Sequence, residues 1–499
     1  MIRRPPRSTL SSSSAASDVY KRQAIATDGL KFRFADLLFN EIINATDNNH
    51  FYIGIGKSDQ YDSASDNVVD PLRNERDDKE ARNNLESIIK VSETAMSFTI
   101  PRHNWTSGTI YDAWSDKQVG RPTNPFYVIT EDQQVYICVA NNKNQQGQVL
   151  PSIIKPSYSV AGVPFHRIFK TTDGYVWKFL YEMTTARTAN FLSAGFMPVQ
   201  FMDSSSASVS ADNDQAKVRS TSKPGQIIGV DIIDRGEGYL STPTLTFVGD
   251  GAGATGTVTL DGTSIGKIDM VGTVADSGMG SGYNFARVDI TGGTPSRPAV
   301  LRPIIGPRDG FGNDPRRDLK STSLMFNAKP VGAQNGEFSV STTGTFGGQS
   351  DFRQITLFRN LDHVDSSVAG NRVELSATRV NRVVTLTTKP AFVKDEKVTG
   401  QSSGTITHID HIDSTGGGGL RLHYHFNNRV DFKPGTFTSS EIVQGATSGV
   451  SGTVDSDSQP KVLGGAIDRY SGDLLYIDNR SRIVRSTTQT EDIKIILTV

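Results

Sequence analysis

Two pairs of internal repeats, in which glycine recurs at fixed places, constrain the fold of this chain most. In the first pair, IGVDIIDRGEGY at 228–239 is echoed by IGKIDMVGTVADSGMGSGY at 265–283, and both copies end in Gly-x-Gly-Tyr. An alternating, strand-like run precedes this sequence in each copy, and another follows it. Glycine at a fixed place marks backbone that needs a positive φ or a tight turn. The repeats therefore predict short strands joined by tight turns.

The second pair lies nearer the C-terminus. EKVTGQSSGTITHID at 396–410 matches EIVQGATSGVSGTVD at 441–455 as E-x-V-x-G-x-x-S-G, with Asp closing both copies. A Lys-Pro dipeptide precedes each copy, at Lys389 and at Lys433. We expect both pairs to form small β modules that serve as binding surface or spacer rather than in chemistry.

The fold class predicted for the whole chain is mainly β (α+β) and multidomain: a β-rich core with a few helices and inserted small β repeat modules. The chain has 499 residues, enough for more than one domain, and its 47 glycines fit many short strands. The runs FYVIT at 126–130 and VYICVA at 135–140 predict a β-hairpin, and GYVWKFLYEM at 174–183 predicts a further strand.

Two further elements are predicted near the ends of the chain. Residues 30–45 read as a helix whose apolar stripe is Phe34, Leu37, Leu38 and Ile42. At the other end, Ile493, Ile495, Leu497 and Val499 share one face of a strand. A core strand at the end of the chain must pair with earlier sequence, so we expect the C-terminus to belong to the main body and the repeats to be insertions.

Shifts in composition divide the chain into six segments. Residues 1–23 resemble a translated sequencing adapter and are set apart from the fold. The remaining predictions are an N-terminal core, a linker with the first Gly-rich insertion, a continuation of the core, the second insertion and C-terminal core strands: 24–203, 204–300, 301–375, 376–462 and 463–499.

The charge balance argues against two classes of partner. Five Lys and Arg residues fall in the first 23 residues, so the rest of the chain is mildly acidic and offers no global field for nucleic acid. No run approaches the roughly 20 apolar residues of a membrane span. We therefore expect no nucleic acid and no membrane as partner. The single cysteine, Cys138, reads as a small buried apolar residue.

Four histidines are the candidate metal ligands. His408 and His411 lie in HIDHID, and His423 and His425 lie in HYH, where alternate residues of a strand point to one face. Such spacing can bind Zn²⁺ or Fe, and a zinc-dependent enzyme is one hypothesis that follows from it. The competing interpretation is a polar outer face of a β module, and no metal is expected.

No other pattern predicts chemistry. GAGATG at 251–256 matches G-x-G-x-x-G, but a dinucleotide site needs a helix to follow, and the next residues, TVTLDG, favour a strand. The carboxylate pairs Asp112/Asp116 and Asp231/Asp234 are of a kind found in any chain of this size. Trp177, flanked by other aromatic residues, reads as core. We expect no catalytic residue and no cofactor.

The segments that read as core carry a family resemblance. They are IPRHNW at 100–105, TDGYVWKFLYEM at 172–183, DFRQITLFRNL at 351–361, and SGDLLYIDNRSRIV with TQTEDIKIILTV at 471–499. In this order, they resemble the baseplate wedge subunit of contractile-tailed (myovirus) bacteriophages. GNDPRRDL at 312–319 is similar to a stretch in marine relatives. The resemblance covers roughly 30–200, 301–362 and 465–499, and the two repeat regions depart from shorter family members.

The resemblance implies a structural protein of the virion that is not an enzyme. It implies a place in the tail baseplate, assembly in the cytoplasm of the host bacterium, other wedge subunits as partners and a homodimer in isolation. The candidate interface residues are Arg73, Arg76 and Arg82 in a charged loop, and Trp105 and Trp114 in an aromatic-rich segment. The alternative is a virion-associated tail protein that binds or depolymerises carbohydrate, built on the Gly-rich repeats.

Overall fold

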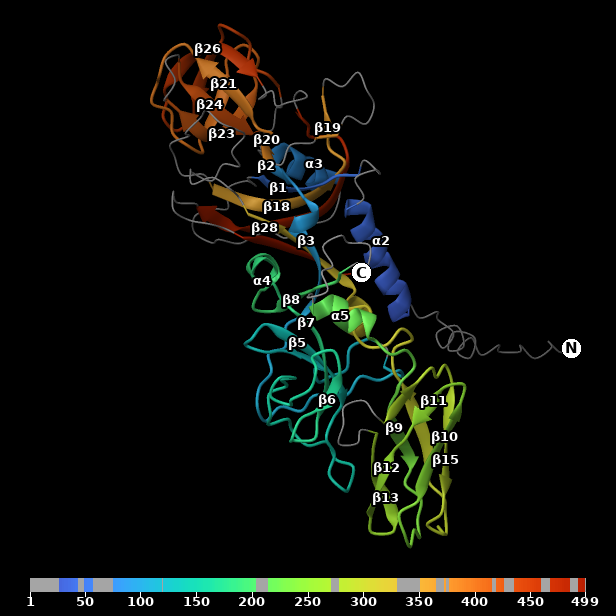
Figure 1. Ribbon diagram of the computed structural model, residues 1–499. Coiled ribbons are helices and arrows are strands. Elements are labelled where there is room, and N and C mark those ends of the chain that lie inside the picture. Colours follow the sequence, from blue (N-terminus) through green and yellow to red (C-terminus); the bar gives the residue numbers. More distant parts are fainter. Residues whose placement is uncertain are drawn as a thin grey trace, which may run out of the picture.

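The computed structural model describes most of the chain between residues 27 and 498. The described residues are 27–43, 49–56, 75–118, 120–202, 214–270, 278–329, 351–364, 372–373, 377–414, 419–425, 435–458, 467–484 and 492–498. They form several sheets and few helices, which confirms the prediction of a mainly β, multidomain protein. Figure 1 shows an elongated molecule with a barrel at one end, a narrow strand module at the other, and the main body between them.

The first sheet of the body joins segments that are far apart in the sequence. Among the described residues its order is β20-β2-β1-β18-β28, with all neighbours antiparallel. Its central strand is FYIGIG, which is buried along its whole length. Gly54 is required there, because an added Cβ would lie 2.5 Å from the Thr356 hydroxyl on β18. The strands are β1 (Phe51–Gly56), β2 (Leu85–Lys90), β18 (Asp351–Arg359), β20 (Ala377–Arg379) and β28 (Asp473–Val484).

The second sheet contains the C-terminal strand. Its order in the described part of the chain is β29-β17-β3-β8, and β29 pairs antiparallel with β17. Ile493 and Ile495 are buried, so the prediction that the last strand belongs to the core is confirmed. Val499 lies outside the described residues. The strands are β3 (Met96–Pro101), β8 (Phe196–Val199), β17 (Ser323–Ala328) and β29 (Ile493–Thr498).

The third sheet has the order β4-β5-β7-β6 over the described residues and contains the predicted hairpin. Tyr127 faces Ile137 in the hairpin register. Trp177 and Cys138 are fully buried, which confirms their interpretation as core residues. The Trp177 ring stacks on Tyr175 at 5.7 Å between ring centroids. The strands are β4 (Tyr127–Ile129), β5 (Gln134–Ala140), β6 (Ile168–Lys170) and β7 (Val176–Glu182).

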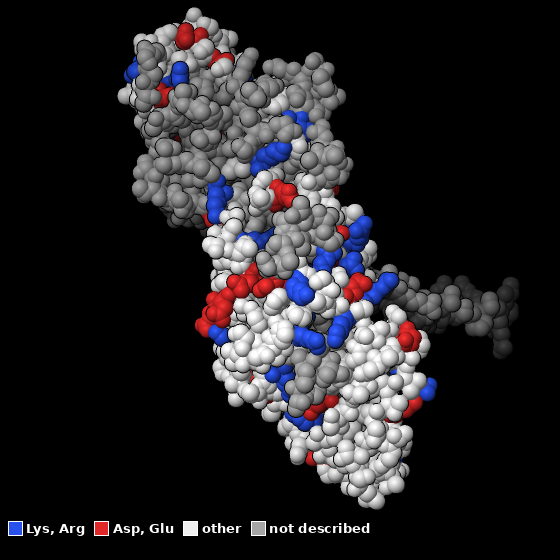
Figure 2. Space-filling model, in the orientation of Figure 1, with Lys and Arg blue, Asp and Glu red and all other residues white. Residues whose placement is uncertain are grey.

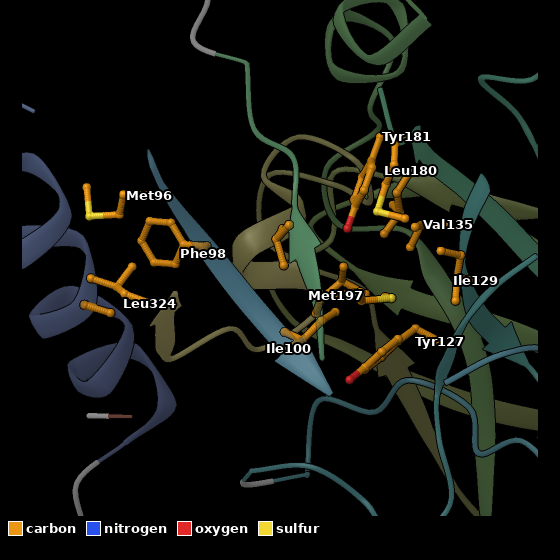
Figure 3. Close-up of a cluster of buried hydrophobic side chains, with 14 of the residues drawn as sticks. Met96, Phe98, Ile100, Tyr127, Ile129, Val135, Leu180, Tyr181, Met197 and Leu324 are labelled. Carbon is orange, nitrogen blue, oxygen red and sulfur yellow. The ribbon is translucent and has the colours of Figure 1, made fainter. Parts of the chain in front are cut away.

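One hydrophobic cluster runs through all three sheets. In Figure 3, Met96, Phe98 and Leu324 lie toward the helix α2 (Asp28–Ile43), and Ile100 and Met197 connect them to the side chains of the third sheet. Burying apolar surface of this extent supplies the main driving force for a shared core. The body therefore packs around one continuous core.

Helix α2 falls where the sequence predicts a helix, but its buried face is not the predicted one. The buried apolar residues are Phe32 and Ala35, whereas Phe34 is 52% and Leu37 is 49% exposed. Leu38 and Ile42 pack partly against the core. The predicted stripe is thus wrong for Phe34 and Leu37. The other helices are α3 (Glu75–Asn84), α4 (Thr185–Phe191), α5 (Asp214–Ser220), α6 (Pro315–Asp318) and the 3₁₀ turn η1 (Glu93–Ala95).

The first repeat pair folds into nested antiparallel pairs at one end of the molecule (Figure 1). All four glycines of the two Gly-x-Gly-Tyr sequences have φ between 57° and 83°. The buried Tyr239 hydroxyl accepts from Ala299 N–H, and the buried Tyr283 hydroxyl from Ala254 N–H, so both copies build similar turns. The pairs are β9 (Ile227–Asp234) with β16 (Val300–Ile305), β10 (Thr244–Gly249) with β15 (Ala286–Thr291), β11 (Ala252–Ala254) with β14 (Met279–Ser281), and β12 (Thr257–Asp261) with β13 (Ser264–Asp269).

The second repeat pair closes into a single barrel of order β21-β24-β23-β22-β25-β26. One copy supplies the β22–β23 hairpin, the other supplies β25–β26, and β22 pairs with β25 where the copies meet. Val398 and Val443, which are equivalent in the repeat, are both buried in the barrel core. The strands are β21 (Arg382–Leu386), β22 (Lys397–Gly400), β23 (Ile406–Asp413), β24 (Arg421–His425), β25 (Ile442–Gly445) and β26 (Ser451–Ser458). Two short strands that pair with each other flank the barrel in the sequence: β19 (Asp362–His363) precedes it and β27 (Ile467–Asp468) follows it.

Candidate functional sites

The charged segment around Arg82 is used inside the chain. Arg82 lies in the last turn of helix α3 and is only 6% exposed. Its guanidinium donates to the carbonyls of Arg469, Ser471 and Gly472 and to the Asp78 carboxylate. These contacts occupy the Arg82 guanidinium within its own chain, and a role of Arg82 in an interface stays a prediction. Arg73 and the Arg76 side chain lie outside the described residues.

Trp105 and Trp114 are both partly buried against the body. The Trp105 indole N–H donates to the Ser152 hydroxyl at 3.3 Å, and the Trp114 ring meets Phe311 edge-on at 5.4 Å between centroids. Each ring thus has a partner in its own chain and keeps some exposed surface. Their role in an interface stays a prediction.

The candidate histidines are brought into register on two neighbouring strands. His408 lies opposite His425 and His411 opposite His423, with a bulge between Ile409 and His411. His423 is buried, whereas the side chains of His411 and His425 lie outside the described part. In the part of the chain that the structure describes, no three His, Cys, Asp or Glu residues are grouped so that they could hold a metal ion.

The barrel contacts the body near these histidines through buried polar groups. Asn381 donates to the buried Asp410 carboxylate at 3.3 Å. Arg469 donates to the carbonyls of Val380 and Asn83, and burial lowers its pKa. Buried polar side chains of this kind fix how two modules meet, because each must keep its hydrogen-bond partner.

The motif GNDPRRDL forms a corner that holds α2 to the body. Asp314 caps helix α6 by accepting from Arg316 N–H, and Pro315 is the first helical residue. The Arg316 guanidinium bonds Asp314 at 3.0 Å and Asp36 of α2 at 3.2 Å, and it lies 3.7 Å from the centroid of the Phe201 ring. This largely buried cation joins three segments of the chain, so the motif has a structural role.

The other candidate motifs of the sequence also have structural roles. GAGATG is followed by strand β12 rather than a helix, as expected. Asp112 accepts from Asn124, and Asp234 accepts from Gly236 N–H and pairs with Arg297. These carboxylates hold turns and ion pairs.

Strand β16 pairs with β9 and so extends the first insertion beyond its predicted boundary at residue 300. The seam between this insertion and the body is ionic, which was not predicted from the sequence. Arg302 on β16 bonds Asp116 of the body at 2.8 Å and Asp231 on β9 at 3.2 Å. Lys117 adds a contact of 2.5 Å to Asp231. The sequence signal was limited to the presence of these charges, since the paired residues lie about 70 to 190 residues apart.

A small cavity lies on the same seam. Its volume is about 70 Å³, and its walls come from β5, β6 and β7 of the body and from β9, β13 and β16 of the insertion. Lys170 and Lys267 lie 3.8 and 3.2 Å from the Asp269 carboxylate, and Lys143 also lines the cavity. Asp269 partly balances the positive charge, and the Lys170–Asp269 pair ties insertion to body.

Comparisons with known proteins identify no family for this chain. No protein-family model matches it, and a search of curated proteins found no match. Within the described ranges, no helix is both long and apolar enough to cross a membrane.

Proposed function

We propose that this protein is a structural subunit of the tail baseplate wedge of a contractile-tailed bacteriophage. In this role it holds neighbouring wedge proteins during assembly and during the rearrangement linked to sheath contraction. It would be assembled in the host cytoplasm and act in the virion, with other wedge subunits as partners and as a homodimer in isolation.

The observation that carries the proposal is that the segments with the family resemblance pack together in the body. The segments at 172–183, 351–361 and 471–499 provide β7, β18, β28 and β29, and the segment at 100–105 begins at the end of β3. Strand β18 pairs with β28, and β29 and β3 share one sheet. Ile100, Leu180 and Ile495 lie in one hydrophobic cluster. Segments that resemble one family in the same order thus build one body, which supports their common origin.

The placement of the repeat modules agrees with such a role. Barrel and nested-strand module project from opposite ends of the body (Figure 1). The barrel is joined to it at Asn381, whose backbone N–H donates to the carbonyl of Glu86 on β2 and whose side chain donates to Asp410 on β23. The nested-strand module is joined to it at Arg302. A scaffold subunit needs a rigid core with separate surfaces for different neighbours, and this arrangement provides them.

The test is co-expression of the full chain with the other wedge proteins of the same phage genome, followed by size-exclusion chromatography with light scattering. Co-elution as a heteromer of defined mass would support the proposal. A lone trimer that ignores the wedge proteins and binds host surface glycan would overturn it in favour of a carbohydrate-binding tail protein. Metal analysis of the same sample would test the zinc-enzyme hypothesis.

A further inference from the structure

Helix α2 presents a second apolar stripe that the described part of the chain does not cover. Leu30, Phe34 and Leu37 are 47%, 52% and 49% exposed. Their spacing of i, i+4 and i+7 places them on one face over two turns, away from the buried Phe32 and Ala35. This spacing is the one with which a helix contacts another helix.

The acidic side chains of α2 are all engaged inside the chain. Asp28 accepts from Gly120 N–H at 2.8 Å and lies 3.6 Å from Lys320. Asp36 bonds both Arg33 and Arg316, and Glu41 pairs with Arg359. Each acidic side chain of the helix thus has a basic partner within the chain.

The basic side chains border the exposed stripe, and two of them, Arg33 and Arg317, are also paired with Asp36 and Asp314. Helical geometry places Lys31 and Arg33 on opposite sides of it. Lys31 is exposed and has no ion pair within the described residues, and the Arg33 side chain is 61% exposed. Arg317, which is 63% exposed, lies beside the helix at 5.0 Å from the Phe32 ring centroid. Figure 2 shows Lys and Arg gathered in this region of the surface.

We propose that the stripe of Leu30, Phe34 and Leu37 binds an amphipathic helix of a neighbouring protein whose own apolar stripe is flanked by Asp and Glu. The apolar seam would supply the contact, and the basic border selects an acidic partner over a basic one. The inference deepens the proposed function, on which it rests, by giving the chemistry of one wedge neighbour.

The first test measures binding without any wedge protein. A synthetic helical peptide of about 20 residues, with Leu along one stripe and Glu on both flanks, is titrated into the full chain and followed by fluorescence anisotropy. The same peptide with Lys in place of Glu is the charge control. We expect the Glu peptide to bind at least tenfold more tightly than the Lys peptide. The double variant Phe34→Gln/Leu37→Gln should lose at least tenfold in affinity for it.

The variants are chosen to keep the fold intact. Phe34 and Leu37 are half exposed, so we expect their replacement to leave the core untouched. An unchanged circular dichroism spectrum checks that the variant is folded. Leu240→Gln is the matched control, because Leu240 is 83% exposed and lies on the first insertion. It should bind the Glu peptide as the wild type does.

The second test uses the co-expressed wedge heteromer. A carbodiimide joins an amine to a carboxylate in direct contact, so Lys31 should cross-link to Asp or Glu in a helix of one neighbour. Lys31→Arg keeps the charge and should lose the cross-link.

Equal binding of both peptides, or none, would overturn the inference. If Phe34→Gln/Leu37→Gln abolished a homodimer, the occupant of the stripe would be a second copy of the chain, which also overturns the inference. Binding to vesicles of anionic lipid that depends on the stripe would overturn it as well. Co-elution with wedge proteins but no selective peptide binding refutes this inference alone. Selective peptide binding without co-elution refutes the proposed function instead.

Discussion

Glu396 and Glu441, which are equivalent in the two barrel repeats, each hold the turn of the other repeat. The Glu396 carboxylate accepts from the N–H groups of Thr447 and Ser448, at 3.1 and 2.9 Å. The Glu441 carboxylate accepts from the N–H groups of Ser402 and Ser403, at 3.1 and 3.0 Å. The two copies are therefore locked together reciprocally, as halves of one barrel.

This exchange predicts a crossed effect of mutation. Glu441→Gln should loosen the turn at 401–404, and Glu396→Gln should loosen the turn at 446–449, because a Gln amide group cannot accept from all these donors. Each change should cost about 2 kcal/mol of local stability, or about 30-fold in amide exchange rate. Hydrogen-exchange mass spectrometry of the full-length variants measures it.

Asp455→Asn provides the control, because Asp455 lies exposed on β26 of the same barrel. It should leave both turns unchanged. Loosening of the turn next to the mutated glutamate, with the other turn unaffected, would contradict the reciprocal arrangement.

The E-x-V-x-G-x-x-S-G pattern indicates that the glutamate and the Ser-Gly turn are structurally important. It does not indicate that the glutamate of one copy binds the turn of the other. A glutamate at the start of each copy and a Ser-Gly turn at its end are equally compatible with two separate modules. The copies meet where β22 pairs with β25, with Val398 opposite Gly445 and Gly400 opposite Val443, and a register between distant strands leaves no local signal.

Helix α2 shows a second limit of what hydrophobic periodicity can predict. Phe32, Ala35 and Phe39 form one helical stripe, and Leu30, Phe34 and Leu37 form a second. The spacing predicts the helix but does not decide which stripe faces the core. Arg316 favours the first, because its guanidinium lies over the Phe32 and Phe98 rings, and it comes from 280 residues downstream. The C-terminal strand was predictable because one of its faces is apolar throughout, whereas the other carries Lys494 and Thr498 beside Ile496.

Replacement of Arg82 should destabilise the protein rather than weaken assembly selectively. Arg82→Met leaves the carbonyls of Arg469, Ser471 and Gly472 without their donor in a buried place. We expect a loss of about 3 kcal/mol in the free energy of unfolding of the body, measured by urea denaturation. Lys79→Ala, at an exposed position of the same helix, should change it by less than about 0.5 kcal/mol. Equal stability of the two variants would show that the internal contacts of Arg82 contribute little.

Charge reversal at Arg302 should open the seam between the first insertion and the body. Arg302→Asp places a third carboxylate beside Asp116 and Asp231, so that attraction becomes repulsion. We expect a larger radius of gyration in small-angle X-ray scattering at low salt, with recovery at high salt. Arg287→Asp is the control, because Arg287 pairs only with Asp289 on its own strand among the described residues. An unchanged scattering curve for Arg302→Asp would show that other contacts suffice to hold the seam.

The buried Asp318 should make stability depend on pH in the neutral range. Its carboxylate accepts from Gly312 N–H at 2.6 Å, and burial raises its pKa to about 8. Between about pH 4 and 8 the folded state keeps a proton that the unfolded state has lost, so the free energy of unfolding falls as the pH rises.

Asp318→Asn keeps a hydrogen-bond acceptor for Gly312 and cannot ionise. Its melting temperature should therefore exceed that of the wild type by a margin that grows from pH 5 to pH 8 and then levels off. Asp455→Asn should follow the wild type at every pH, whereas a constant difference between Asp318→Asn and the wild type would mean that Asp318 is already ionised in the folded protein.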